Sequence, residues 1–290
     1  MFTFDIDRAY CLALAAELVY DDAASIEQTV LHEWHFSHFQ FFDVDNTQCF
    51  VAANDDAVIV SFRGTELDCI TDWITDLDFN LIAGPFGGKV HDGFFEALSN
   101  VWELVHRQVG SLIENGRRTL WVTGHSLGAA LATLAVARWR ENRQPVGGLY
   151  AFGQPRTGDR TFSQNFDFDF KPYTFRIVNH RDVVTRTPPR ALGYRHTGTF
   201  KYFNDAGEMM DHIGWWRLFL RSRSGPIQSL LSWGGGGIRD HSMSGYRQRL
   251  EADVGRVYAL QSNAVGSQQS DSRAVAVVLP GEQESLRRAA

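Results

Sequence analysis

The sequence has few cysteines, no excess of basic charge and no metal-ligand cluster. Only three cysteines, Cys11, Cys49 and Cys69, occur in 290 residues. They are widely spaced in apolar surroundings, so we expect small buried hydrophobic residues rather than a disulfide framework or a metal site. No group of His, Cys and Glu has the spacing of metal ligands, and no cofactor is expected. The formal net charge of −6 argues against a nucleic-acid partner.

Long apolar runs are also missing. No stretch of roughly 18 uncharged apolar residues occurs, so no transmembrane segment is expected. Residues 1–7 are acidic and lack a basic region followed by an apolar run, so no secretory signal is visible. These features fit a cytoplasmic protein, or one exported by a route that the residues do not reveal. They say nothing of oligomeric state.

The segments that are present alternate between strand and helix patterns. A hydrophobic fraction of 44% over 290 residues suits one large domain with a substantial core. Strand-like runs and helix-like runs follow one another, which predicts an α/β fold with a mostly parallel sheet and helices on both faces. We assign residues 1–260 to one domain and the polar residues 261–290 to a C-terminal extension. The predicted strands are 48–53, 57–62, 119–123, 148–152 and 174–178, and the predicted helices are 6–20, 94–113 and 129–140.

The most informative motif is Gly124-His125-Ser126-Leu127-Gly128. It has the pattern G-x-S-x-G, and it lies between a β-rich run and a strong helix-forming run. A serine on a sharp turn from strand to helix is the nucleophile elbow of α/β-hydrolases. Side chains in place of the two glycines would collide across this turn. The N–H of Leu127, the first of the new helix, is placed to face a developing oxyanion. The alternative is a glycine-rich turn that contains a serine by chance.

A serine nucleophile needs a base and an acid, which in this fold follow it in the order acid, then histidine. Asp182 follows the strand 174–178 and lies at the strand's C-terminal end, where such sheets place functional groups. His241 lies in a loop that opens a final helix running through Leu250. The other reading of Asp182 is a solvated aspartate beside a neighbouring arginine. Three other histidines lie beside Asp182 or after it in the sequence, and each has a simpler interpretation. They are His180, His196 and His212.

His180 is close in sequence to Asp182 and lies in the same loop. We therefore do not expect it to be the histidine that Asp182 binds from another loop. His196 falls in a strand-like run, Tyr194 to Phe200, and is interpreted as a sheet residue. His212 precedes a tryptophan-rich segment and suits a lid or the surface.

A second oxyanion donor is expected at the end of an earlier strand. The run Ser61-Phe62-Arg63-Gly64-Thr65 ends the predicted strand 57–62. Gly64 allows the backbone to turn, and Thr65 then offers its N–H and its hydroxyl. The alternative is an ordinary turn that terminates a strand.

Together these motifs resemble the class 3 lipase family, the fungal-lipase-like branch of the α/β-hydrolases. They occur in family order over about residues 45 to 250, which makes the combination specific. The motifs are Phe62-Arg63-Gly64-Thr65, Val90-His91-Asp92-Gly93-Phe94, the run 122–132, the run 152–158, the run 176–182 and Asp240-His241.

The resemblance implies Ser126 as nucleophile, Asp182 as orienting acid, His241 as general base, and Thr65 with Leu127 as oxyanion donors. It implies hydrolysis of lipid carboxylic esters without a cofactor, at an oil or membrane interface. A triacylglycerol lipase is the first hypothesis. A phospholipase A1-type acyl hydrolase, a short-chain carboxylesterase and a catalytically silent interaction module are the alternatives. The chain departs from secreted fungal members in its scattered cysteines and in extra residues between Asp205 and His241.

In the family, a short helix after the Arg-Gly-Thr motif covers the site. Here that stretch is about residues 66–79, and an aspartate recurs on its polar face at Asp68, Asp72 and Asp76. Like charges at this spacing make a helix marginal without its apolar face, as a movable lid requires. The alternative is a fixed surface helix. The residues predicted to form the apolar, substrate-facing stripe are Leu67, Ile70, Trp73, Ile74 and Leu77.

An insertion at about residues 211–237 is dense in tryptophan and arginine. Its core, residues 213–233, suits either a lipid headgroup layer or a core-packed segment covered by arginine stems. The sequence leaves both interpretations open. It also leaves open the acyl chain length, the positional selectivity and the temperature optimum.

Overall fold

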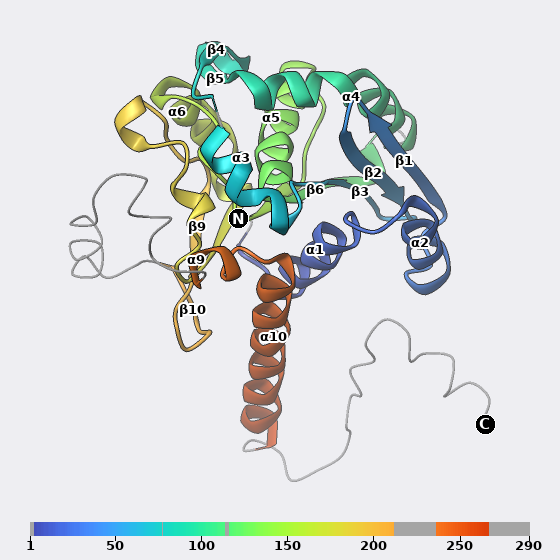
Figure 1. Ribbon diagram of the computed structural model, residues 1–290. Coiled ribbons are helices and arrows are strands. Elements are labelled where there is room, and N and C mark those ends of the chain that lie inside the picture. Colours follow the sequence, from blue (N-terminus) through green and yellow to red (C-terminus); the bar gives the residue numbers. More distant parts are fainter. Residues whose placement is uncertain (1–2, 77, 114–115, 212–235, 267–290) are drawn as a thin grey trace.

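A computed structural model describes residues 3–76, 78–113, 116–211 and 236–266. The architecture is an α/β-hydrolase fold built on one large sheet with the strand order β1-β2-β3-β6-β7-β8-β9-β10 (Figure 1). Strands β3, β6, β7, β8 and β9 pair in parallel, and the outer strands pair antiparallel. The predicted mostly parallel sheet is therefore confirmed. The strands of this sheet are β1 (His38–Val44), β2 (Thr47–Ala53), β3 (Ala57–Phe62), β6 (Thr119–His125), β7 (Gly148–Phe152), β8 (Thr174–Asn179), β9 (Thr199–Phe203) and β10 (Met209–Met210).

Helices cover both faces of the sheet. Helices α4 and α5 lie together on one face, where α5 packs on β6 and β7. Helix α1 packs on β6 and β7 from the other face and also contacts α10, which extends away from the body in Figure 1. A two-stranded ribbon, β4 (Leu81–Ala83) with β5 (Lys89–His91), leads into α4. The described helices are α1 (Ile6–Leu18), α2 (Ala23–Gln28), α3 (Ile70–Asp76), α4 (Asp92–Leu112), α5 (Leu127–Glu141), α6 (Arg160–Phe170), α9 (Gly236–Arg239) and α10 (Met243–Gly266).

The apolar spacing of α4 explains how the first face is closed. Phe94, Leu98, Val101, Val105 and Val109 recur at three- and four-residue intervals and are all buried. Helix α5 is buried almost all round, because it lies between α4 and the sheet. These residues belong to the largest core cluster, which holds the strand that leads to Ser126.

The parallel arrangement determines where functional groups meet. Strands β3, β6, β7 and β8 run in the same direction, so their carboxyl ends lie at one edge of the sheet. Thr65, Ser126, Gly153 and Asp182 all follow those ends within a few residues. The fold thus gathers at one edge residues that are far apart in the sequence.

The expectation that all three cysteines are buried is wrong for two of them. Cys49 is buried in β2, but Cys11 and Cys69 are exposed, and all three are free. Helix α1 buries its small residues, including Ala9 and Ala13, and Cys11 lies midway between these two on the solvent side. For Cys11, the face of the helix on which it lies decides its exposure, not the hydrophobicity of its neighbours in the sequence.

The predicted strand from Tyr194 to Phe200 is misplaced. Strand β9 runs from Thr199 to Phe203, so His196 precedes the sheet and is not a sheet residue. Gly198 separates the two segments: its φ is +78°, which interrupts an extended backbone, and its N–H donates to Asp167 Oδ1 over 2.7 Å.

The final helix is longer than predicted. Helix α10 continues past Leu250 to Gly266. Charged pairs one turn apart support the added turns, with Arg247 Nη1 3.0 Å from Glu251 Oε2 and Arg256 Nη2 2.8 Å from Asp253 Oδ1. The division at residue 260 into a domain and an extension stays a prediction. Within the described residues, no helix has the length and apolar character needed to cross a membrane.

Acid should destabilise the fold through His91, which caps α4 by accepting the N–H of Phe94. Burial lowers the pKa of His91 to about 4, while the unfolded residue titrates near 6.5. Above pH 6.5 both states hold a neutral ring. Between pH 6.5 and 4 the unfolded state binds a proton that the folded state does not, so stability falls by up to about 1.4 kcal/mol per pH unit.

This expectation can be measured by urea unfolding between pH 7 and pH 4.5. The matched variant is His91→Asn, which keeps a side-chain acceptor for the helix cap and removes the titrating ring. Its stability should fall less steeply with decreasing pH than that of the parent chain. An identical slope for the two proteins would show that His91 is not the group concerned.

Candidate active site

Ser126 lies on a strained turn between β6 and α5. Its φ is 58° and its ψ is −127°, which non-glycine residues rarely adopt. The turn is also tight: a Cβ atom on Gly124 would lie 2.4 Å from the carbonyl oxygen of Gly128. The Ser126 N–H donates to the carbonyl of Phe152 on β7 over 3.0 Å, so the neighbouring strand holds the turn. Strain of this kind persists only where the surrounding structure imposes it, and it is common at functional sites.

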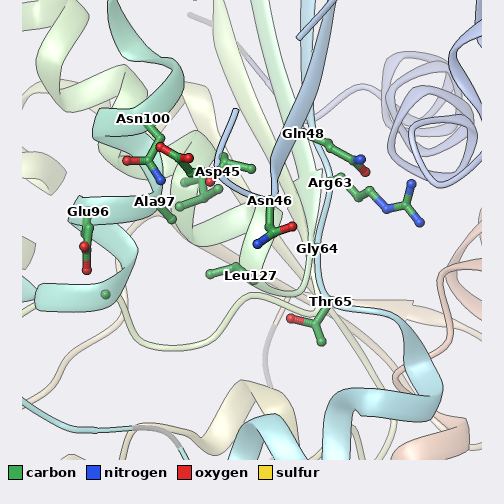
Figure 2. Close-up of a pocket in the computed structure, with 13 residues that line it drawn as sticks. Asp45, Asn46, Gln48, Arg63, Gly64, Thr65, Glu96, Ala97, Asn100 and Leu127 are labelled. Atoms are coloured by element: carbon green, nitrogen blue, oxygen red, sulfur yellow. The ribbon is translucent and has the colours of Figure 1, made fainter. Parts of the chain in front are cut away.

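The residues proposed as oxyanion donors border one hollow beside the serine (Figure 2). Its volume is about 520 Å³, and Thr65 and Leu127 both line it. Thr65 comes from the turn after β3, and Leu127 comes from the first turn of α5. The fold thus brings together the two residues that the sequence predicts as oxyanion donors. The wall also carries polar side chains, among them Asn46, Gln48 and Asn100.

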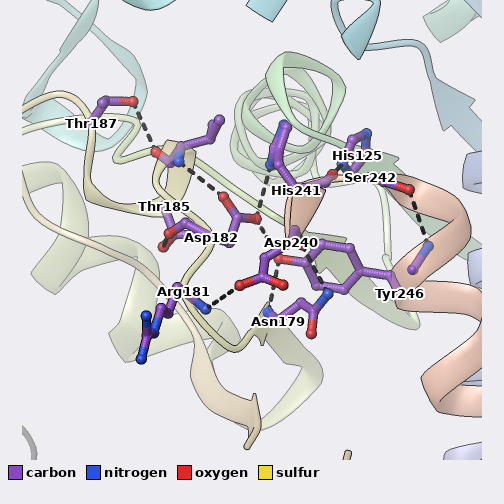
Figure 3. Close-up of polar contacts among 12 residues, drawn as sticks. His125, Asn179, Arg181, Asp182, Thr185, Thr187, Asp240, His241, Ser242 and Tyr246 are labelled. Carbon is purple, nitrogen blue, oxygen red and sulfur yellow. Dashed lines mark hydrogen bonds and ion pairs between the residues drawn. The ribbon is translucent and has the colours of Figure 1, made fainter. Parts of the chain in front are cut away.

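Asp182 and His241 are hydrogen-bonded to each other (Figure 3). His241 Nδ1 lies 2.8 Å from Asp182 Oδ2, and both side chains are almost fully buried. The other carboxylate oxygen, Oδ1, accepts the N–H of Val184 over 2.9 Å. The aspartate is thus held by its own loop and presents one oxygen to the histidine, the arrangement that orients a catalytic imidazole.

The opposite side of the imidazole is directed away from these contacts. His241 Nε2 and Ser126 Oγ are both buried, and neither has a hydrogen-bond partner among the described residues. Buried polar atoms normally find partners, and unpaired ones are frequent where chemistry takes place. In a serine hydrolase, the proton passes between a serine hydroxyl and a histidine nitrogen that are left free in this way.

Tyr246 is a residue that sequence analysis missed. Its buried hydroxyl donates to Asp182 Oδ2 over 2.5 Å and accepts the N–H of Asn179 over 2.9 Å (Figure 3). Burial and the adjacent carboxylate raise the pKa of Tyr246 well above its ordinary value, so the hydroxyl stays a donor. Tyr246 lies in the first turns of α10, five residues after His241. Tyr246 therefore positions the Asp182 carboxylate and joins the helix that follows His241 to β8.

His125 provides a second connection and also has a defined protonation state. Its Nε2 lies 2.6 Å from the backbone carbonyl of His241, and a carbonyl can only accept, so Nε2 carries the proton. Its Nδ1 then accepts the hydroxyl hydrogen of Tyr20 over 2.8 Å. Burial lowers the pKa of His125 well below its ordinary value, in keeping with this neutral form. The residue beside the serine thus supports the backbone of residue 241.

Asp240 fastens the same loop from its other side. Its Oδ2 accepts the N–H of Arg181 over 3.0 Å and lies 3.1 Å from Nδ1 of His180, while its carbonyl accepts Nδ2 of Asn179 over 2.9 Å. His180 is therefore bound to Asp240. The loop after β8 and the loop before α10 are thus joined by side chain and backbone.

Gly153 makes room for the Asp182–His241 pair. It follows β7 with a φ of +60°. A Cβ atom there would lie 2.9 Å from Asp182 Oδ2 and also 2.9 Å from His241 Nδ1. Only a residue without a side chain leaves both atoms where they are.

The predicted lid region, about residues 66–79, contains the helix α3, which is shorter than the predicted stretch. A 3₁₀ turn, Leu67–Cys69, precedes α3. Ile70 and Ile74 are buried and pack against Val183 and Val184 beside Asp182. Trp73 stacks on Phe94 with ring centroids 6.0 Å apart.

Leu67 does not join this apolar face, because it lies in the 3₁₀ turn and is exposed. Leu77, His212 and the tryptophan-rich segment 213–233 lie outside the described residues. His196 lines a different hollow, together with four arginines.

The sequence pattern of the family described as "Lipase (class 3)" matches residues 59–192. This match contains the serine turn and the loop of Asp182. Over residues 59–192 the chain is therefore similar to class 3 lipases.

The chain has named relatives among fungal lipases. It is 34% identical over 169 residues to a lipase of Rhizomucor miehei, covering 55% of this chain and 46% of that one. It is 35% identical over 162 residues to secreted mono- and diacylglycerol lipase 1 of Fusarium solani, covering 52% and 45%. The chain thus spans slightly less than half the length of these curated relatives.

A solved structure extends the similarity over a longer part of the chain. It is a triacylglycerol lipase described as having a serine protease triad as its catalytic centre. The TM-score is 0.61 at 25% identity, covering 80% of this chain and 96% of that one.

Proposed function

We propose that this chain is a class 3 lipase and hydrolyses carboxylic esters of lipids through an acyl-enzyme on Ser126. The observation that carries the proposal is the pairing of Asp182 with His241 over 2.8 Å at the sheet edge that also bears Ser126. The similarity to a lipase with a serine protease triad supports it. Asp182 is the orienting acid, His241 the base and Ser126 the nucleophile.

The reaction has two halves. His241 Nε2 takes the proton of Ser126 Oγ as the oxygen attacks the ester carbonyl, and Asp182 stabilises the imidazolium that forms. The N–H groups of Thr65 and Leu127 stabilise the oxyanion. His241 then gives its proton to the leaving alcohol, and water repeats the sequence on the acyl-enzyme to release the fatty acid.

Triacylglycerol is the first substrate that we propose. Helix α3 supports it, because its apolar residues Ile70 and Ile74 pack against Val183 and Val184, in the loop that carries Asp182. An oil interface competes for such a face and allows the helix to move aside.

A second candidate follows from the hollow beside Thr65 and Leu127. Asn46, Gln48 and Asn100 line it, and these amide side chains suit free hydroxyl groups better than a third acyl chain. Mono- and diacylglycerols carry such hydroxyls, and a relative is named for them.

A hydrolysis panel tests the proposal and ranks the substrates. It comprises mono-, di- and triacylglycerols and phospholipids of several chain lengths, with covalent labelling by a fluorophosphonate as the readout of a reactive serine. We expect labelling and release of fatty acid from at least one acylglycerol. An unlabelled, inactive protein would mean a silent family member, and preferential hydrolysis of phospholipids would favour an A1-type enzyme.

Replacing two residues of α3 tests its role as a lid. In Trp73→Ala with Ile74→Ala, hydrolysis of emulsified triacylglycerol should fall by about tenfold, the equivalent of about 1.4 kcal/mol of lost interfacial contact. Hydrolysis of a soluble p-nitrophenyl ester should stay the same or rise, since the shortened face holds the helix less firmly over the site.

The matched control is Leu104→Ala, which removes an exposed leucine from α4. It should leave both rates unchanged. Equal losses on emulsion and soluble ester in the double variant would show that α3 is a fixed surface helix.

A further inference from the structure

A hollow lined by four arginines lies apart from the serine. Its volume is about 470 Å³, and we call it the arginine hollow. Three segments form it: the loop after β7, the first turns of α6, and the stretch before β9. The lining residues are Arg156, Arg160, Arg190 and Arg195, with Ser163, Gln164 and His196. None of these residues lines the hollow beside Thr65 and Leu127.

The positive charge of the arginine hollow has no counter-charge in its lining, which contains no carboxylate. The nearby acids are engaged elsewhere. Asp159 accepts the N–H of Phe162 at the start of α6, and Asp167 accepts the N–H of Gly198. Asp167 also pairs with Lys171 over 3.5 Å. In a chain with net charge −6, this is a local concentration of cations.

Two of the arginines are held by backbone carbonyls. Arg156 Nη1 donates to the carbonyls of Arg186 and Pro188, the latter over 2.8 Å. Arg195 Nη1 donates to the carbonyls of Arg190 and Tyr194 over 3.0 and 2.7 Å. Each guanidinium has five N–H donors, so both retain donors while their planes are fixed. Such preorganisation lowers the entropy lost when a ligand binds.

Burial and mutual repulsion act on the cations of the hollow. Burial lowers the pKa of Arg156 to about 10, and the positive charges of Arg190, Arg195 and Arg186 contribute to this shift. Arg156 therefore stays charged at neutral pH. Burial and neighbouring arginines lower the pKa of His196 well below its ordinary value. The buried Nδ1 of His196 has no hydrogen-bond partner among the described residues.

We propose that the arginine hollow binds a phosphate group. The planar fork of arginine matches phosphate oxygens in pairs, and four such forks suit a dianion. Every lining residue is of a polar type, so the hollow has no aliphatic or aromatic hydrophobic side chain against which an acyl chain could pack. The lack of hydrophobic side chains favours phosphate over a fatty-acid carboxylate, which is the other anion expected near a lipase. The phosphate belongs either to a small soluble anion or to a lipid headgroup.

The first arm of the test uses inorganic phosphate. Calorimetric titration and thermal unfolding of the full chain are measured at constant ionic strength, with chloride as the reference anion. We expect phosphate to bind and to raise the melting temperature. In Arg160→Gln with Arg190→Gln, both of them exposed residues, the affinity should fall at least tenfold. The control is Arg107→Gln with Arg143→Gln, two exposed arginines outside the hollow, which should bind as the parent chain does.

The second arm uses vesicles of ether-linked phosphatidylcholine with or without ether-linked phosphatidic acid, which present no ester to hydrolyse. Cosedimentation that requires phosphatidic acid and Arg160 with Arg190 identifies the lipid headgroup as the source. Binding of phosphate without vesicle binding identifies a small soluble anion. Binding in neither arm overturns the proposal, and so does an equal loss in the control variant, which would mean non-specific attraction. The test does not depend on Ser126 chemistry.

Discussion

Ser126→Ala should lower the kcat for p-nitrophenyl esters by about a million-fold, leaving the residual rate that binding and oxyanion donors supply. The loss is this large because the nucleophile, its base and its acid act as one unit. Labelling by a fluorophosphonate should disappear with the activity.

The fold should survive this replacement. Ser126 Oγ makes no hydrogen bond to the described residues, and alanine meets the same backbone strain that serine does. Circular dichroism and the melting temperature should therefore match the parent chain. Ser99→Ala, an exposed serine on α4, is the matched control and should retain full turnover. Substantial turnover by Ser126→Ala would refute the assignment of the nucleophile.

Asp182→Asn should lower kcat by about ten-thousand-fold. The carboxylate accepts three hydrogen bonds, from His241, Tyr246 and Val184, whereas an asparagine has one oxygen for them. At least one donor then faces an NH₂ group. Either His241 loses the acceptor that fixes its tautomer, or the loop at Val184 shifts, and in both cases the imidazolium lacks its anion. The free energy of unfolding should fall by about 1–3 kcal/mol.

Tyr246→Phe separates charge from position. It keeps the Asp182 carboxylate and its bond to His241, and removes only the hydroxyl that Asp182 and Asn179 share. We expect a loss of about tenfold in kcat, which corresponds to one hydrogen bond. Steady-state kinetics of the two variants on the same soluble ester give the comparison. Equal losses in Asp182→Asn and Tyr246→Phe would mean that orientation alone, and not the negative charge, accounts for the role of Asp182.

Local patterns predict much of this molecule. The strand before Ser126 and the helix after it are encoded within about twenty residues, and the parallel order of the sheet follows from the alternation of strands and helices. The place of Asp182 at this edge was predictable in the same way, because the carboxyl ends of parallel strands share one edge. His241 was predicted from the order in which acid and histidine follow the serine in this fold.

Contacts between distant segments were not predictable. Tyr20 and His125 are 105 residues apart, and Tyr246 and Asp182 are 64 residues apart, so neither pair leaves a periodic signal. The predictions for Leu67 and His196 are wrong for another reason. Hydrophobic or strand-like sequence was assigned to regular elements there, but a 3₁₀ turn exposes Leu67, and the bend at Gly198 separates His196 from β9.

Gly153 has a consequence for how a site of this kind can be lost in evolution. A single base change turns any glycine codon into an alanine codon, and here that change would force apart Asp182 and His241, each 2.9 Å from the new carbon. Such a descendant would keep its serine, aspartate and histidine and still lose their alignment. Inactive members can therefore arise with every triad residue in place, and residue 153 should be inspected with the triad when genomes are searched for working lipases.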